Sequence, residues 1–278
     1  MLVIDLGSNY IKYGISGTKK PHNIIISKVY KINDQYTLTK DTSSKIKYIE
    51  PIKNGVIVNF SRMDIIWKKI FQDLETIDNV KNNDILISEP LYVTMEYKNK
   101  LINHLKNTYN IKNVYFCNQQ YLGMLGYCCT YGIVIDIGYT STRIVPVCDN
   151  YIILEAIIIL SLSKNQFDTY LKNNKSNLHI NEYFLNPFII NVDQISITQA
   201  LYNCINKCPI DLKKKLCSNI IIIGGGANHE LGHELKKDFD NKYSNFTLNI
   251  NVPNNKNMII WLGCSIMATL LTNNSFIS

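Results

Sequence analysis

Two carboxylates in this sequence occupy the same local pattern. Segment 3–8 reads VIDLGS and segment 134–139 reads VIDIGY, so Asp5 and Asp136 each end an apolar strand just before a glycine turn. A buried carboxylate is costly unless it is paired, and a glycine lets backbone N–H groups approach an anion closely. Two such hairpins facing each other predict a site that grips a polyphosphate, with both aspartates holding a divalent cation through water.

A third glycine-rich turn strengthens this prediction. One Asp-x-Gly hairpin is an ordinary turn in most proteins, but two copies in one chain favour a functional role. Residues 220–223 are four isoleucines, which is typical of a strand buried on both faces, and three glycines follow at 224–226. Because α/β proteins bind ligands at the carboxyl ends of such strands, we expect a nucleotide to approach the bare backbone there.

Composition limits the class of protein. The chain has 278 residues, of which 46% are hydrophobic and 18% charged, and this favours a folded protein with a substantial core. The net charge of +7 is too diffuse to indicate nucleic-acid binding. The 8 cysteines form no CxxC pair and have no histidine at zinc-ligand spacing, so we expect reduced, mostly buried thiols. The most apolar stretch, 151–160, is too short to span a bilayer.

The elements that must position these residues alternate in type. Helices are expected to begin at Ser61 and at Ser163, where Gln166 would complete a capping box, and segments 31–45 and 173–191 are expected to be irregular. The hydrophobic patterns predict strands at 2–5, 10–16, 23–30, 46–59, 84–88, 113–117, 132–137, 141–147, 151–160, 219–223 and 246–251, and further helices at 94–106, 119–127, 195–205, from 209, 230–243 and 260–272. The order repeats and predicts an α/β protein of two related halves.

With these motifs in place, the sequence resembles the actin family. The resemblance is collinear over nearly the whole chain. It implies an α/β, two-lobed actin-like ATPase fold with duplicated ribonuclease H-like halves. The segments that carry it are Asp5–Gly14 and Gly132–Pro146 as two phosphate loops, Pro51–Phe60 before the first long helix, Asp168–Leu171, Asn203–Gly226 ending in the adenosine loop, and Trp261–Ala268.

The resemblance implies a role for each matching residue. The cofactor would be ATP or ADP with Mg²⁺ or Ca²⁺. Lys12 would bridge phosphate oxygens, and Gln119 would position a water at the γ-phosphate. Asp5 and Asp136 would hold the hydrated cation. The remaining nucleotide contacts would come from Gly7, Ser8 and Asn9 in the first hairpin, Gly138, Tyr139 and Thr140 in the second, and Gly225, Gly226 and Ala227 in the adenosine loop.

The sequence also departs from the actin pattern. Asn9 stands where actins have glycine, and Tyr139 and Thr140 replace an acidic residue and a glycine. Arg143 stands where actin has a histidine near the hydrolytic water, and a guanidinium cannot share a proton with that water. Asn257 replaces a lysine of the adenine pocket. The expected enzyme activity is therefore at most that of a weak ATPase.

The resemblance implies two lobes, at 1–126 with 260–278 and at 127–259. The outer subdomain of the first would be reduced at about 22–50, and that of the second largely missing at about 173–195. Both regions make longitudinal filament contacts in actin, so we do not expect this chain to form filaments alone.

The expected function is therefore that of a non-polymerising, nucleotide-binding subunit. Its protein partners would belong to a multi-subunit cytoskeletal or chromatin-associated complex, with actin or other actin-related proteins as candidates. It would lie in the cytoplasm or cytoskeleton, with the nucleus as the alternative, and would contact neither membrane nor nucleic acid directly. Two rival functions are a filament-forming cytoskeletal ATPase and a small-molecule kinase of the same superfamily. The kinase would need a catalytic base aimed at a substrate hydroxyl, and the sequence offers no candidate beyond the two aspartates.

Overall fold

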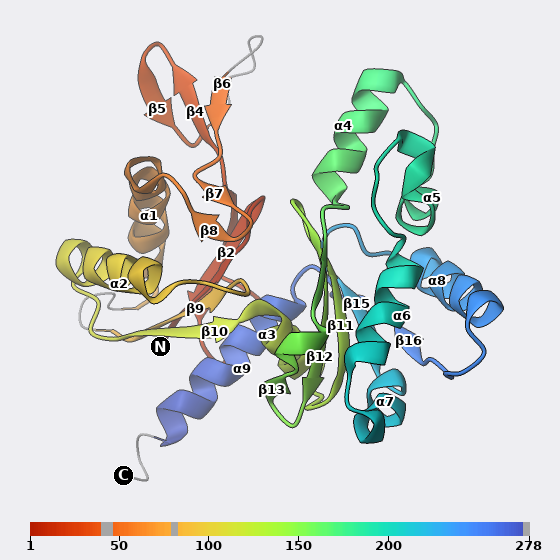
Figure 1. Ribbon diagram of the computed structural model, residues 1–278. Helices are drawn as coiled ribbons and strands as arrows, with labels where there is room; N and C mark the ends of the chain where they lie inside the picture. The colour runs from red at the N-terminus through yellow and green to blue at the C-terminus, as the bar shows by residue number, and fades with distance from the viewer. Residues whose placement is uncertain (40–46, 79–82, 275–278) are drawn as a thin grey trace. The chain divides into compact units, whose positions relative to one another are not determined.

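The computed structural model describes residues 1–39, 47–78 and 83–274. Contacts divide the chain into two compact units, Met1–Leu122 with Ile260–Ser278, and Gly123–Ile259. They are called unit 1 and unit 2 below, and each is described by itself (Figure 1).

Unit 1 is built on one sheet of five strands, β1 (Leu2–Leu6), β2 (Tyr10–Ile15), β3 (Asn23–Ile26), β9 (Ile85–Glu89) and β10 (Val114–Asn118). Their order is β10-β9-β1-β2-β3. β1 and β2 form an antiparallel hairpin, and β9 and β10 extend the sheet in parallel beyond β1. The carboxyl ends of β1, β9 and β10 therefore lie along one edge.

Helices cover both faces of this sheet. Leu2 and Ile4 share a buried cluster with Trp67 of α1 (Phe60–Glu75) and Leu101 of α2 (Met95–Tyr109). Val3 points the other way and packs with residues of α3 (Gln119–Gly126) and α9 (Ile259–Asn274). Because β1 is buried on both sides, its sequence is a nearly continuous apolar run, and Asp5 is its exception.

The start of α1 differs from the prediction. The helix begins at Phe60, and its N-cap is Asn59 rather than Ser61. Asn59 has an extended backbone with φ −136°, and its side-chain oxygen accepts a hydrogen bond from Arg62 N at 3.0 Å. An N-cap needs this non-helical backbone, which Ser61 lacks because it already lies inside the helix.

The outer part of unit 1 is more broken than the sequence suggested. The predicted strands 23–30 and 46–59 are wrong as single elements. The loop predicted at 31–45 contains a strand in its described part, and residues 40–46 lie outside the described residues. The observed pieces are a sheet of β4 (Val29–Ile32), β5 (Gln35–Thr37) and β6 (Lys47–Ile49), and a hairpin of β7 (Ile52–Lys53) and β8 (Val56–Ile57).

Two tight turns account for the reversals between β4 and β5 and between β7 and β8. Asn33 and Asn54 each have positive φ, at 47° and 52°, and so do the residues that follow them, Asp34 and Gly55. Two consecutive left-handed residues make the tight hairpin turn that joins antiparallel strands. The chain therefore reverses at both places.

Unit 2 has the same sheet plan. Its strands are β11 (Gly132–Ile137), β12 (Thr142–Cys148), β13 (Tyr151–Ile152), β14 (Ile158–Leu160), β15 (Ile220–Ile223) and β16 (Ile250–Asn251). The order is β13-β12-β11-β15-β16, with β14 also paired to β12. A central hairpin is again followed by two parallel strands, as in unit 1.

The helices of unit 2 are α4 (Lys164–Asn174), α5 (Ile180–Leu185), α6 (Ile197–Lys207), α7 (Ile210–Cys217) and α8 (His229–Lys242). Two 3₁₀ turns accompany them, η1 (Leu154–Ala156) and η2 (Pro187–Ile190). One apolar cluster joins Ile133 and Ile222 of the sheet to Leu201 of α6 and Leu235 of α8. This packing fixes the strand ends that carry the candidate site.

Four predictions for unit 2 are corrected. The predicted strand 151–160 is interrupted by η1, and that at 246–251 is reduced to β16. The segment 173–191 is not irregular, because it contains α5, whose Tyr183 and Phe184 are fully buried. Pro209 is the N-cap of α7 rather than its first residue.

The predicted fold class is confirmed. The two units repeat one strand order, with a hairpin in the middle and two parallel strands beside it. Asp5 and Asp136 are the next-to-last residues of equivalent strands, so the sequence repeat reflects a structural repeat.

Candidate functional site

In unit 1, Asp5 lies in the sheet interior with both carboxylate oxygens occupied. Only 2% of Asp5 is exposed. Lys12 Nζ contacts Asp5 Oδ2 at 2.6 Å, and Ser88 Oγ donates to Asp5 Oδ1 at 2.8 Å. Lys12 comes from the neighbouring strand β2, and Ser88 from the parallel strand β9. The buried charge is therefore both neutralised and hydrogen-bonded, as a stable buried carboxylate must be.

Gln119 joins the same cluster from the first residue of α3. Its Nε2 donates to Leu6 O at 3.2 Å and lies 3.4 Å from Ser88 Oγ. Leu6 N in turn donates to Ser88 Oγ at 2.9 Å. The predicted residues Asp5, Lys12 and Gln119 are thus brought together.

The turn after β1 is anchored from two sides. Ser8 Oγ accepts a hydrogen bond from Gly55 N at 2.9 Å, which links the hairpin to the β7–β8 turn. Ser27 donates from its hydroxyl to Gly7 O at 2.7 Å and from its N–H to Asn9 O at 2.9 Å. These two bonds use carbonyl oxygens of the turn rather than its N–H groups. An anchored turn with its carbonyls held on one side suits anion binding by its amides.

In unit 2, Asp136 has a basic partner at the equivalent position. Asp136 is 5% exposed and Arg143 is 9% exposed. Arg143 Nη1 lies 4.0 Å from Asp136 Oδ2, across the β11–β12 hairpin. Burial lowers the pKa of the Arg143 guanidinium, and the Asp136 carboxylate opposes this shift. At neutral pH the guanidinium stays charged because its ordinary pKa is so high.

The second hairpin turn is closed differently from the first. Gly138 N donates to Ser141 O at 3.0 Å, so this amide is already used. The carbonyls of Gly138 and Tyr139 accept from Lys164 N and Asn165 N, at 3.2 and 3.1 Å. The hydroxyl of Ser141 is buried and has no hydrogen-bond partner among the described residues. An unpaired buried hydroxyl is unfavourable, so a hydrogen bond from Ser141 to a ligand or a water molecule would be stabilising.

The glycine turn after β15 lies beside Asp136. Gly224 has φ +95°, and a Cβ there would come within 2.9 Å of Asp136 Oδ1 and 2.4 Å of Ile137 O. Gly226 N donates to Ile137 O at 3.1 Å. Only glycine at position 224 therefore lets the backbone of this turn lie so close to the β11–β12 hairpin.

The three residues expected to contact adenosine differ in exposure. Gly225 is exposed and has open space around its missing Cβ, whereas Gly226 and Ala227 are buried. Asn228, the next residue, caps α8 and donates to Asn181 Oδ1 at 2.9 Å. Contact of a nucleotide with Gly226 and Ala227 stays a prediction.

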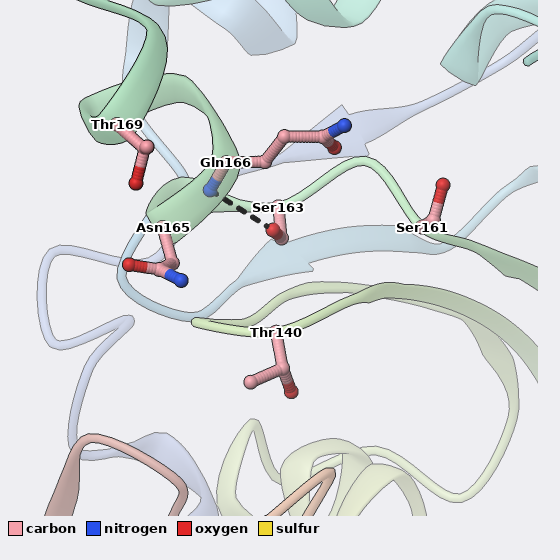
Figure 2. A pocket seen from close by; sticks show the side chains of 6 residues that line it. All are labelled: Thr140, Ser161, Ser163, Asn165, Gln166 and Thr169. Carbon is pink, nitrogen blue, oxygen red and sulfur yellow. Dashed lines mark hydrogen bonds between the residues drawn. The ribbon is translucent and has the colours of Figure 1, made fainter. Parts of the chain in front are cut away.

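A polar pocket of about 410 Å³ adjoins the second hairpin (Figure 2). The side chains that line it are hydroxyls and amides, from Thr140, Ser161, Ser163, Asn165, Gln166 and Thr169. The first backbone N–H groups of α4 are already bonded, since Lys164 N and Asn165 N bind the hairpin and Gln166 N donates to Ser163 Oγ. Side chains rather than the helix terminus would therefore make the polar contacts in this pocket.

Only half of the predicted capping box forms here. Ser163 Oγ caps Gln166 N, but Ser163 N donates to Tyr183 OH at 3.0 Å. The Tyr183 hydroxyl donates to Gln166 Oε1 at 2.7 Å. Tyr183 thereby takes the place of the reciprocal bond and orients Gln166 at the pocket.

Other chemistries have less support. Among the described residues, no group of three or more His, Cys, Asp or Glu side chains could hold a metal ion. Burial raises the pKa of the Cys117 thiol to about 12, so it is protonated at neutral pH and not a nucleophile. No helix in the described part of the chain is both long and apolar enough to cross a bilayer.

Comparison with known proteins decides the family. A sequence profile of the actin family matches residues 1–187 and 174–277. The chain belongs to the actin family. It is similar to actin-like protein 7A of Mus musculus, with 23% identity over 339 aligned positions that cover 97% of this chain and 77% of the relative. It is also similar to centractin of Schizosaccharomyces pombe, with 27% identity over 169 positions, 56% of this chain and 45% of that protein.

Actin-family proteins generally bind a nucleotide together with a divalent cation. Within unit 1 the anchored first turn suits a phosphate group. Within unit 2 the Ser141 hydroxyl, which has no hydrogen-bond partner among the described residues, would suit one as well. The cation part fits less well. Asp5 and Asp136 each face a basic side chain of their own hairpin, so they would reach a cation only through water.

Sequence reasoning missed Ser88 and Tyr183 at the candidate site, and it missed the pairing of Arg143 with Asp136. Ser88 binds Asp5 directly, and its signal was available, because it stands at the carboxyl end of a strand parallel to β1. Tyr183 lay in a segment expected to be irregular. The pairing of Arg143 with Asp136 follows from hairpin register, once the two strands are known to be antiparallel.

Proposed function

We propose that this actin-family chain binds ATP or ADP. The observation that carries the proposal is the duplicated arrangement in which a buried aspartate ends a strand before an anchored glycine turn. In unit 1 the phosphate contacts would be Gly7, Ser8, Asn9 and Lys12. In unit 2 they would be Gly138, Tyr139 and Thr140, with Gly225, Gly226 and Ala227 against the adenosine.

A bound Mg²⁺ or Ca²⁺ would be carried by the phosphate oxygens. Asp5 and Asp136 would contact it through water, because their own oxygens face Lys12, Ser88 and Arg143. Mg²⁺ usually keeps several waters and suits such an outer-sphere arrangement. The cation would supply positive charge at the phosphates.

We propose slow hydrolysis at most. Gln119 would orient the attacking water through its Oε1, since its Nε2 is held by Leu6 O. Arg143 could stabilise phosphate charge but offers no base that accepts a proton from water. The nucleotide would act chiefly as a structural ligand, which stabilises the folded state in proportion to its occupancy.

Isothermal titration calorimetry with ATP tests nucleotide binding. Thr140→Glu places a carboxylate in the second hairpin and is expected to weaken binding by about tenfold or more through charge repulsion. Thr39→Glu makes the same change at an exposed position of unit 1 and should leave binding unchanged. A folded wild-type chain that binds neither ATP nor ADP would refute the proposal.

We further propose that the chain works as a non-polymerising subunit of a larger protein assembly. Unit 2 exposes Tyr151 and Leu154 in one short segment, at 79% and 55%, and these would supply apolar area for a partner. The assembly would be cytoskeletal and cytoplasmic, with a chromatin-associated, nuclear complex as the alternative.

Native mass tests the subunit role. The tagged chain from its own cells should elute in a discrete complex well above 32.0 kDa, and the co-purifying proteins would identify the assembly. A lone species of that mass would contradict the role. A pellet that forms with Mg-ATP and grows with protein concentration would instead support a filament-forming ATPase.

A further inference from the structure

A small sheet in unit 1 carries basic and aromatic side chains in one row. The sheet consists of β5, β4 and β6, labelled at the top of Figure 1. Lys31 of β4 lies opposite Tyr36 of β5 on one side and opposite Lys47 of β6 on the other. Residues directly opposite each other in antiparallel strands point to the same face. Tyr36, Lys31 and Lys47 therefore cross one face of this sheet.

The guanidinium of Arg62 extends this row. Its Cζ lies 3.4 Å from the centre of the Tyr36 ring, and Arg62 belongs to the first turn of α1. A guanidinium that stacks on an aromatic ring keeps its N–H groups in its own plane, where they can bind a carboxylate. Lys31, Tyr36, Lys47 and Arg62 are called the basic row below.

The positive charges of the basic row stand where the fold alone disfavours them. Lys31 and Lys47 are like charges at directly opposed positions, which destabilises a strand pair. Arg62 lies at the end of α1 whose dipole repels a cation, and the first turn of this helix contains no acidic residue. Asp34 pairs with Lys31 at 2.7 Å, but its side chain is 92% exposed, so it offsets little of this charge. A negatively charged partner would relieve both placements.

The size of the basic row suits a peptide that carries carboxylates. Neighbouring strands are about 4.8 Å apart, so the row from Tyr36 to Lys47 spans about 10 Å. Alternate side chains of an extended peptide are about 7 Å apart, so about two carboxylates of one segment fit this span. The Arg62 guanidinium matches a carboxylate through paired hydrogen bonds.

A single-stranded nucleic acid suits the basic row less well. Such ligands bind by stacking their bases on open aromatic faces. The Tyr36 ring is partly buried against the core of unit 1, and the Arg62 guanidinium lies over it. The ring therefore serves to orient Arg62 rather than to receive a base.

We propose that the basic row is a docking site for an acidic, extended segment of a partner protein. Arg62 binds one carboxylate through paired hydrogen bonds, and Lys31 and Lys47 hold carboxylates beside it. The inference is independent of nucleotide binding, and it goes beyond the subunit role because it names the chemistry of a partner. Native mass decides the subunit role, whereas the purified chain with a synthetic peptide decides this inference.

Fluorescence anisotropy with a labelled peptide of alternating Glu and Thr tests the docking site. We expect saturable binding that weakens as salt is added, and about tenfold weaker binding by Lys47→Glu. Lys237→Glu makes the same change at an exposed position of α8 and should bind within about twofold of the wild-type chain. No saturable binding by the folded wild-type chain, or equal losses in the two variants, would overturn the inference.

The stability of the free chain supplies a second test. Lys47→Glu places opposite charges across β4 and β6, so it should raise the urea midpoint while it weakens peptide binding. A lower urea midpoint would contradict the unfavourable placement of the two lysines on which the inference depends. Arg62→Lys keeps the charge but loses the paired hydrogen bonds, and it should weaken peptide binding by about threefold. Unchanged affinity in the folded variant would contradict the role of Arg62.

The class of partner is tested with a single-stranded polythymidylate of the same net charge as the peptide. We expect it to bind more weakly than the peptide at equal salt, because the Tyr36 ring offers no open face for stacking. Tighter binding of the polythymidylate, lost in Lys47→Glu, would overturn the assignment to an acidic protein segment.

Discussion

The hydroxyl of Ser88 ties the Asp5 carboxylate to the backbone of its own strand. Ser88 Oγ donates to Asp5 Oδ1 at 2.8 Å and accepts from Leu6 N at 2.9 Å. Ser88 is 1% exposed, so water cannot replace either bond without local opening. The position of the candidate cation ligand thus depends on a neighbouring strand.

Removing this hydroxyl should destabilise unit 1. Ser88→Ala leaves Leu6 N and one oxygen of Asp5 without their buried partner, and we expect the free energy of unfolding to fall by about 1–3 kcal/mol. Urea unfolding of Ser88→Ala and of the wild-type chain measures the difference, and equal stabilities of these two chains would show that the Ser88 bonds contribute nothing.

Two adjacent glycines in the turn after β15 are expected to contribute very differently to folding stability. Gly224 has φ +95° and its missing Cβ would meet Ile137 O at 2.4 Å, so Gly224→Ala should cost more than about 2 kcal/mol of folding free energy. Gly225 has nothing within 4 Å of its Cβ position, and Gly225→Ala should change stability by less than about 0.5 kcal/mol.

A larger side chain at Gly225 tests the expected contact with adenosine. The larger Gly225→Val should weaken ATP binding by about tenfold or more if the nucleotide lies against this exposed backbone. Calorimetry measures it, with urea unfolding as the check that the variant is folded. Unchanged affinity in a folded Gly225→Val chain would remove Gly225 from the nucleotide site.

Acid should loosen the attachment of α1 to the sheet of unit 1. Tyr13 of β2 donates to Asp73 Oδ2 at 2.6 Å. Burial alone would raise the pKa of Asp73, but hydrogen bonds from Lys69, Tyr13 and Asn23 outweigh it and lower that pKa. A lowered carboxyl pKa stabilises the fold above the unfolded value, about 3.9, and this contribution disappears as pH falls through the folded value.

Asp73→Asn should therefore flatten the decline in stability below about pH 4. Urea unfolding from neutral to acid pH measures the slope. Asp240→Asn changes an exposed carboxylate of α8 that pairs only across one helix turn, and it should follow the wild-type curve. If Asp73→Asn also follows that curve, the Tyr13–Asp73 bond does not contribute to acid sensitivity.

Tyr183 should link the stability of unit 2 to its polar pocket. Tyr183→Phe leaves Ser163 N without its acceptor and frees Gln166, so unfolding should become easier by about 1–3 kcal/mol. The control is Tyr202→Phe, which removes a hydroxyl from a partly buried ring stacked on Tyr243. Similar small losses in Tyr183→Phe and Tyr202→Phe would contradict the role of the Tyr183 hydroxyl.

The central strands could be predicted from the sequence because burial on both faces produces nearly continuous apolar runs. The runs at 2–6, 132–137 and 220–223 made the repeat visible, and the glycines after them located the turns. Elements at the edge were harder to predict. Asn54-Gly55 breaks a β-branched stretch, and α5 is held by the burial of Tyr183 and Phe184, which a short polar segment does not reveal.

The sequence suggested residue types for a candidate site but not their pairings. The structure brings Asp5, Lys12 and Gln119 into one cluster, and their roles toward a nucleotide stay predictions. Ser88 and Arg143 act through register between strands, and register depends on which strands are neighbours in the sheet. The tertiary structure determines which strands are neighbours, and a single sequence does not show this.

The nucleotide content of the native protein tests the central claim most directly. The chain is purified without denaturant, equilibrated with ATP, freed of unbound ligand and then denatured, and the released nucleotide is quantified by ion-exchange chromatography. We predict about one adenine nucleotide per folded chain, which is the stoichiometry of a single site. A folded chain that releases none after equilibration with ATP would contradict nucleotide binding.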